Sequence, residues 1–354
     1  MNYADEYIRR ALRINRVSDS EIINANERIK SLSDKITLLL ANLANNNRSE
    51  VALNISRVIS EEFSHLSDVS DRVTRNILRK ELIWHEEVLA AYSGRSIVPL
   101  NPERVVESVR SLIFKGRSFQ EWYRQTSATL ADKAIRAINS GFITGQNITQ
   151  ITDTVKTVTG VSGKNVRTLV RSNILSTANQ ARTASVDNNV DLFDGKIWVS
   201  TLDIRTTPEL CGIRDGLEYS MTNEPLGHDI PWEGGPGELH FNCRSTWIPK
   251  ITGVDIATRR PSVDAGDSYN RGDHLTATGK VKKAVKKNRD DGTFSIGSRN
   301  LNSTNYEDWL RKQPKDFISD ALGSSDRAQS FLSGSAVQDV TGAPFGAPIS
   351  LNDL

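Results

Sequence analysis

A helical repeat pattern runs through the first half of the chain and limits its fold more than any other feature. From Met1 to about Asn189, apolar residues recur at three- and four-residue spacing, and glycine and proline are rare. This spacing puts the apolar side chains on one face of an α-helix, which must be buried against other elements. Two such stripes are Ile22, Ile29, Ile36 and Leu39, and Val51, Ile55, Val58 and Ile59. We expect these stripes to form a helical core.

Capping signals divide this region into separate helices. Asn101 followed by Pro102 predicts a helix start, because Asn caps free amides and proline tolerates the first turn. Ser118 and Glu121 have the spacing of a capping box, which predicts another start. A connection is expected at 42–47, and further helices at 69–92, 147–158 and 165–189.

The pattern changes after Asp194 and Gly195. Alternation typical of strands appears at 196–201 and again at 243–248, so we predict a domain boundary near residue 192. The expected fold is a mostly α N-terminal region, then a small α+β domain, then an extended, partly helical C-terminal region. The expected divisions are helices at 1–192, the α+β unit at 193–252, a basic linker or arm at 253–303, and C-terminal helices and a tail at 304–354.

Within the last division, Thr304 and Glu307 resemble a capping box that opens a helix. Pro314 would restart this helix and Gly323 would end it. The tail at 342–354 ends in apolar residues, and we expect it to dock on a partner.

Composition excludes several classes of protein. The 45 Lys and Arg residues against 43 Asp and Glu give a net charge of +2, so the chain as a whole has no polyanion-binding character. The acidic start does not resemble a signal peptide, and no apolar run approaches the roughly 20 residues of a membrane span. The chain is therefore expected to begin in a cytoplasm, where its two cysteines stay as thiols or metal ligands.

A local basic run stands in the predicted arm. Its charges are Lys280, Lys282, Lys283, Lys286, Lys287 and Arg289. A clustered basic run attracts polyanions whatever the total charge, so one interpretation is a DNA-binding arm. The other is a solvated charge run.

Cys211, His240 and Cys243 form a candidate zinc site. The His-x-x-Cys spacing lets two ligands reach one tetrahedral metal from a turn, and Cys211 would supply a third ligand from a distant loop. Candidates for the fourth ligand are Asp203, His228 and Asp229. Two other interpretations stay open: the cysteines are packed as small apolar residues, or they form a disulfide in an oxidising setting.

Charged residues next to the predicted strands have a structural interpretation. Asp203 and Arg205 follow one strand, and Arg244 precedes the other, so carboxylate and guanidinium groups can pair and lock a small domain. The stretch has no nucleophile elbow, phosphate loop, HExxH helix or dinucleotide fingerprint. Catalysis is therefore not the expected role.

The order of spaced residues from 165 to 249, about a quarter of the chain, resembles the head-morphogenesis domain of tailed phages, the Mu-like minor head proteins. The residues that carry it are Arg171-Ser172-Asn173, Asn179-Gln180-Ala181-Arg182, Trp198-x-x-Thr201-x-Asp203-x-Arg205-Thr206, Cys211, Asp215-Gly216, Tyr219, Pro236-x-x-x-His240-x-Asn242-Cys243-Arg244-Ser245 and Pro249. Two segments near the C-terminus, Tyr306-x-x-Trp309-Leu310 and Leu322-Gly323, also resemble such proteins.

The resemblance implies a minor capsid protein associated with the portal. The expected partners are the portal protein, the major capsid or scaffold protein, phage genomic DNA and further copies of the chain. The expected location is the host cytoplasm during assembly and then the head interior near the portal vertex, with a role in head assembly, genome packaging or DNA delivery and without turnover.

Two rival functions stay open. One is a DNA-binding ejection protein that coats or leads the genome. The other is an enzyme, either metal-dependent or like the ADP-ribosyltransferase domain that some relatives carry, although the matching Arg/Ser/Glu-x-Glu constellation does not occur here.

Overall fold

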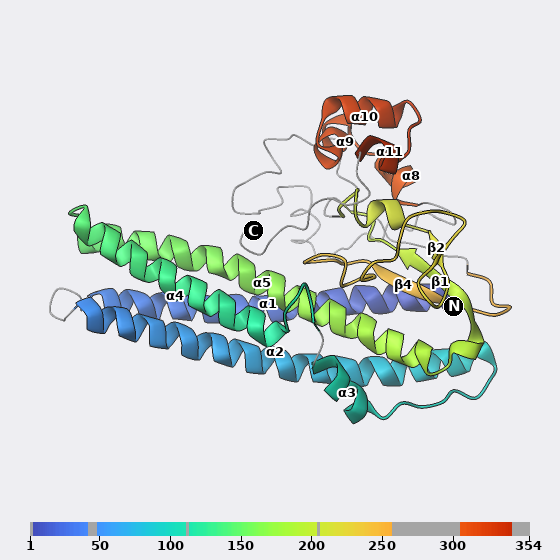
Figure 1. Cartoon of the computed structure of the whole chain (residues 1–354), viewed down its shortest axis with the longest axis horizontal. Helices are drawn as coiled ribbons and strands as arrows, with labels where there is room; N and C mark the ends of the chain where they lie inside the picture. Colours follow the sequence, from blue (N-terminus) through green and yellow to red (C-terminus); the bar gives the residue numbers. More distant parts are fainter. Residues whose placement is uncertain (1–2, 42–47, 111–112, 204–205, 257–304, 342–354) are drawn as a thin grey trace, which may run out of the picture.

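The computed structural model describes residues 3–41, 48–110, 113–203, 206–256 and 305–341. Long helices form an elongated bundle, a small sheet lies at the end of the bundle that holds the N-terminus, and short C-terminal helices lie above that sheet (Figure 1). The arrangement confirms the predicted fold class. Among the described helices, none has both the length and the apolar character that a bilayer span requires.

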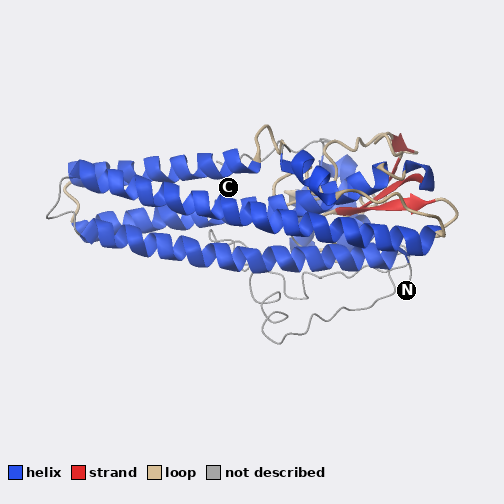
Figure 2. Cartoon of the chain, turned by 90° about the horizontal axis from the view of Figure 1, so that it is seen from below, coloured by secondary structure: helices blue, strands red, loops and turns tan. Residues whose placement is uncertain are grey.

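Four long helices make the bundle (Figures 1 and 2). They are α1 (Tyr3–Ala41), α2 (Arg48–Ser93), α4 (Phe119–Ile143) and α5 (Ile148–Asp187), and the shorter α3 (Pro102–Arg110) packs against α2 and α5. Helix α5 contacts each of the other three long helices. Helix α2 does the same, so α2 and α5 together form the centre of the bundle.

The apolar spacing of the sequence explains the core. On α1 the buried side chains recur every three or four residues, at Ile22, Ala25, Ile29, Leu32, Ile36 and Leu40. They join one apolar cluster with residues of α2, α4 and α5. At roughly 25 cal/mol per Å² of apolar surface removed from water, this burial is the main stabilising contribution of the bundle.

Two predicted helix breaks were wrong. Helix α2 is continuous from 48 to 93, although the sequence suggested a separate helix at 69–92. Helix α5 is continuous from 148 to 187, although the sequence suggested an interruption between 158 and 165. Gly160 and Gly163 lie inside α5, where glycine costs about 1 kcal/mol relative to alanine. A Cβ at Gly163 would lie 3.4 Å from Cγ2 of Ile29 on α1, an ordinary contact distance, so α1 packs directly against this position.

The predicted helix starts are confirmed. Ser118 caps α4 in a reciprocal capping box with Glu121, and Asn147 caps α5 in the same way with Gln150. The side chain of Asn101 accepts a hydrogen bond from the backbone amide of Glu103 at the start of α3. Local capping chemistry therefore sets where these helices begin.

The sheet is antiparallel, with strand order β3-β2-β1-β4. The strands are β1 (Phe193–Val199), β2 (Glu218–Tyr219), β3 (Pro225–Leu226) and β4 (Thr246–Ile251). Both predicted strands exist, and they pair with Ile197 opposite Ile248. The second begins three residues later than predicted, because 243–245 belong to the loop that carries the Cys and His side chains. The two-residue strands β2 and β3 are too short to be recognised from alternation.

The sheet and the bundle share one apolar core. Tyr3 and Tyr7 of α1, Leu89 of α2 and Val186 of α5 pack with Trp198 and Trp247 of the sheet. The predicted boundary near residue 192 coincides with the passage from α5 to β1. The two sides of this boundary therefore pack against each other through side chains from distant parts of the sequence.

The C-terminal helices form a small cluster of their own. They are α8 (Tyr306–Leu310), α9 (Lys315–Leu322), α10 (Ser325–Leu332) and α11 (Val337–Thr341), and they pack on Leu202 and Ile213. The cap of α8 is Asn305, which accepts from the amide of Asp308, instead of the predicted Thr304. Gly323 ends α9 in the left-handed conformation, as predicted. The predicted basic arm from residue 257 onward and the tail at 342–354 lie outside the described residues.

Candidate metal centre

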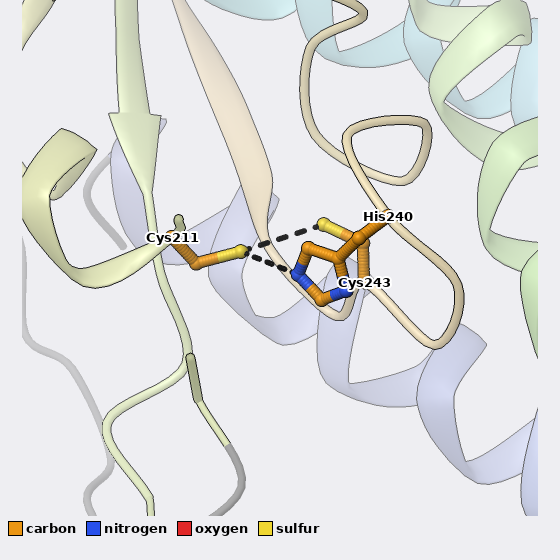
Figure 3. Close-up of side chains that lie close together, drawn as sticks. All are labelled: Cys211, His240 and Cys243. Carbon is orange, nitrogen blue, oxygen red and sulfur yellow. Dashed lines mark hydrogen bonds between the residues drawn. The ribbon is translucent and has the colours of Figure 1, made fainter. Parts of the chain in front are cut away.

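Three potential ligand side chains converge between the sheet and α5 (Figure 3). The Sγ atom of Cys211 lies 3.0 Å from Nε2 of His240 and 3.7 Å from Sγ of Cys243. All three donor atoms lie within 4.8 Å of one another. The three residues that the sequence predicted as ligands lie on two separate loops, and the structure brings their donor atoms together.

The loop that carries His240 and Cys243 is docked on α5 by polar contacts. The backbone amide of Asn242 donates to Oγ of Ser172 at 2.9 Å, and its side-chain amide donates to Oγ1 of Thr168 at 3.1 Å. Asn242 has a φ of 60°, a left-handed conformation that Asn tolerates better than most residues. This turn lies between His240 and Cys243, whose side chains both approach Cys211.

Gly237 brings the same loop into close contact with α5. Its φ is +81°, and a Cβ at this position would lie 2.6 Å from Nδ2 of Asn179 and 3.0 Å from the carbonyl oxygen of Leu175. Only glycine fits this conformation and this distance without displacement of its neighbours. The amide of Gly237 also donates to Sγ of Cys243 at 3.2 Å, so the close approach places a donor on the sulfur.

Cys211 is positioned from the opposite side by the turn after β1. Its amide donates to the carbonyl oxygen of Thr207 at 2.9 Å, and its own carbonyl accepts from Oγ of Ser200 at 2.5 Å. The carboxylate of Asp215 accepts from the amide of Ser200 at 2.7 Å, which ties the turn to the end of the strand. The turn leads into the 3-10 helix η3 (Gly212–Arg214).

The electrostatics favour one thiolate at Cys243. Burial opposes ionisation there, but the hydrogen bond from Cys211 and the charge of His240 together lower the pKa of Cys243 well below its usual range. Burial and the neighbouring Cys243 raise the pKa of Cys211 well above its usual range. Burial lowers the pKa of His240, yet the negative Cys243 outweighs it and the net direction is up. A cation at this position would replace the protons that these groups share and would stabilise the negative charge on the sulfurs.

The donor set and its surroundings fit zinc. Two sulfurs and one imidazole are ligands that zinc prefers. Nδ1 of His240 lies 2.7 Å from the carbonyl oxygen of Phe241, a contact that fixes the tautomer with Nε2 free to face Cys211. With the amide of Gly237 on Cys243, two of the three donors have a supporting hydrogen bond.

The structure does not bring the suggested fourth ligands into this cluster, which among the described residues consists of Cys211, His240 and Cys243. His228 instead contacts the carbonyl oxygen of Glu218 at 2.8 Å through Nε2 and accepts from the amide of Ile230 through Nδ1. Asp229 is likewise not a member of the cluster.

Asp203 is engaged by Arg244 in a bidentate ion pair, one of whose hydrogen bonds, from Nη2 to Oδ1, measures 2.6 Å. Both side chains are largely buried, so the pair joins the end of β1 to the start of β4. Arg205, the third residue of the proposed structural set, lies outside the described residues, as do Lys280 to Arg289.

The structure bears on the two other interpretations of the cysteines, a disulfide and packing as small apolar residues. Both thiols are free and buried, and their separation of 3.7 Å is that of unbonded sulfurs. Both side chains also belong to the apolar cluster shared by the sheet and the bundle. Packing therefore accounts for their burial, but it does not account for the imidazole that points at Cys211.

Sequence reasoning missed the residues that support the site from α5. Arg182 donates to the carbonyl oxygen of Trp247 at 2.6 Å and to Oγ1 of Thr246, and Glu238 accepts from Gln180. In the sequence, Arg182, Gln180 and Asn179 carry only the resemblance to the phage family. An arginine within an apolar helical stripe was the available signal, because arginine is almost never fully buried unless paired.

Comparison with known proteins supports the resemblance. Residues 130–248 match the family model described as Phage Mu protein F like protein. No curated protein and no solved structure matches the chain. The matched segment contains all of α5, strands β1 to β3, the first half of β4 and the three donors. The resemblance to Mu-like phage head-morphogenesis proteins is therefore confirmed over this segment.

Proposed function

We propose that this chain is a structural minor head protein of a tailed phage that acts beside the portal, without catalytic turnover. The observation that carries the proposal is the family match over 130–248. The matched segment is also a structural unit, since its central helix, sheet and Cys/His loop contact one another directly. The elongated bundle then provides long helical faces for partners.

We further propose that Cys211, His240 and Cys243 hold a structural zinc ion. Bound zinc would link the turn after β1 to the loop docked on α5, in addition to the ion pair of Asp203 with Arg244. This support is geometric: three donors, a fixed imidazole tautomer and an amide directed at a sulfur. Both sulfurs are buried, which favours a structural role over a catalytic one.

Portal binding tests the first proposal. The full chain is mixed with rings of the portal protein from the same phage and sedimented at moderate salt, with and without nuclease. Co-sedimentation that persists after nuclease treatment is expected. A chain that stays in the supernatant under both conditions contradicts portal association.

A variant that lacks residues 280–289 separates this function from DNA ejection. If the chain is a portal-associated protein, the deletion leaves co-sedimentation with portal unchanged. If its main role is to coat DNA, the deletion abolishes a strongly salt-dependent binding to duplex DNA and the intact chain shows no affinity for portal.

Elemental analysis of the purified chain tests the zinc proposal. About one zinc per chain is expected, as the three converging donors serve one ion. Cys243→Ser should lose the metal, whereas the control His228→Asn should keep it, because His228 lies outside the cluster. A chain purified without chelators that contains no metal contradicts the proposal.

A further inference from the structure

The outer face of α1 carries a regular row of exposed residues. The row alternates steps of four and three residues, the spacing of a helical stripe that can pack against another helix. It consists of Arg9, Arg13, Arg16, Ser20, Ile23, Glu27, Lys30 and Asp34, all exposed. The opposite face of α1 packs in the bundle core.

Charges on the two flanks of α1 are paired within the chain. Arg10 binds Glu81 and Arg28 binds Glu62 on the side of α2, and Asp19 binds Arg171 on the side of α5. The charged residues of the outer row form no ion pair with any described residue. The outer row is therefore a charged surface of α1 that the described part of the chain leaves unmatched.

Charge along this row is divided by position. The first part holds three arginines, whereas the second part holds Glu27 and Asp34 with a single lysine. A polyanion would be attracted to the first part and repelled by the carboxylates of the second. A surface with the reverse order of charges would match both parts.

An antiparallel second copy of α1 has that reverse order. A two-fold axis between residues 21 and 22 puts each position of the row opposite another position of the row. It brings Arg9 opposite Asp34 and Arg16 opposite Glu27, and each contact occurs twice because the axis makes the interface isologous. Ile23, which is 59% exposed, lies beside the axis next to Ser20 of the other copy.

We propose that the outer face of α1 is a self-association surface on which two copies of this chain pair antiparallel. The paired row spans residues 9 to 34, about 38 Å at 1.5 Å per residue. The same register brings Arg13 opposite Lys30, a like-charge contact that weakens the dimer. A single helical face with exposed ion pairs gives a weak interface.

Sedimentation equilibrium of the full chain tests this surface. At low salt, which screens the charges least, and at concentrations up to about 100 µM, the wild type should form a dimer. Arg16→Glu and Glu27→Arg should each weaken the dimer at least tenfold, and the double variant should restore it. Lys30→Glu should tighten the dimer by removing the like-charge contact. All of these side chains are exposed, so circular dichroism should report an unchanged helical content for each variant.

Three results would overturn the proposal. A wild type that stays monomeric across this range has no such interface. Single reversals without effect, or a double variant that stays as weak as the singles, would place any dimer elsewhere. If Arg16→Glu instead lowers affinity for duplex DNA while the wild type remains monomeric, the row serves a polyanion. The test needs neither portal nor zinc, so its outcome is independent of the proposed function.

Discussion

The two ends of the bundle are filled by different chemistry. At the end where α1 passes to α2, the interior is aliphatic, with Leu32, Ile36, Leu40 and Ile55 among its members. At the end that meets the sheet, Glu81, His85 and Arg182 are buried among aromatic rings. The first end tolerates any apolar side chain of suitable volume, whereas each polar group at the second end needs its own partner.

This contrast separates stability from specificity. Aliphatic burial holds helices together without selecting which loop packs on them. Arg182 does select which segment packs on the helices, because its guanidinium donates to Thr246 and Trp247 of β4 and stacks on Tyr7 of α1. The polar end therefore determines where the sheet docks, and its Arg182 lies in the segment that matches the phage family.

The largest loss is expected from a truncation at the aliphatic end. Leu32→Ala should lower the free energy of unfolding by about 3 kcal/mol, because the side chain is fully buried and leaves a cavity. Leu38→Ala is the control, since Leu38 is 68% exposed and should change stability by less than about 0.5 kcal/mol. Urea denaturation measures both, and equal effects would contradict the assigned core.

Gly237→Ala should have the next largest effect, about 2 to 3 kcal/mol, because the methyl group meets α5 in addition to the strain of positive φ. Gly116→Ala is a matched control with φ +82° and open space around it, so it should lose only about 1 to 2 kcal/mol from strain alone. Denaturant midpoints of the two variants report the difference. Indistinguishable midpoints would mean that the loop does not press on α5.

Arg182→Met should cost about 2 kcal/mol, because the carbonyl of Trp247 and the hydroxyl of Thr246 lose a buried donor. Near-UV circular dichroism should also change, since Trp247 lies close to this guanidinium. A variant as stable as the wild type would show that the desolvation of Arg182 cancels its hydrogen bonds, as happens for some buried charges.

The smallest effect concerns pH. Burial lowers the pKa of His85 well below its usual range, and the charges of Arg182 and Arg10 lower it further. Below about pH 6.5 the unfolded chain takes up a proton at His85 that the folded chain refuses, so stability falls by about 1 kcal/mol between pH 6.5 and 5.5.

Glu81 acts in the opposite direction. Burial raises the pKa of Glu81, although Arg10 and Arg182 oppose the shift, so the folded chain binds this proton more readily and gains stability as pH falls. The contribution of His85 is therefore measured as the difference in pH dependence between wild type and His85→Phe. Parallel curves would contradict a neutral, buried imidazole.

Within the site, the sequence predicted Cys211, His240 and Cys243, because ligand type and spacing are local properties. It did not predict the roles of Gly237 and Arg182. The close approach of Gly237 to α5 and the hydrogen bond from Arg182 on α5 to Trp247 on β4 both depend on segments distant in the chain. For Asp203 the sequence left two interpretations open, an ion pair or a fourth ligand, and the structure pairs it with Arg244. The partners of His228 were supplied only by folding.

The sequence by itself determined the helical class, the capped helix starts and the two main strands, because periodicity and capping act over a few residues. Tertiary structure decided that α5 runs unbroken through Gly160 and Gly163, because the packing of α5 as a whole against α1 outweighs the low helix propensity of the two glycines. It also decided that the Cys/His loop lies on α5. That placement depends on contacts between residues about 60 to 70 positions apart, such as Ser172 with Asn242, which no local pattern encodes.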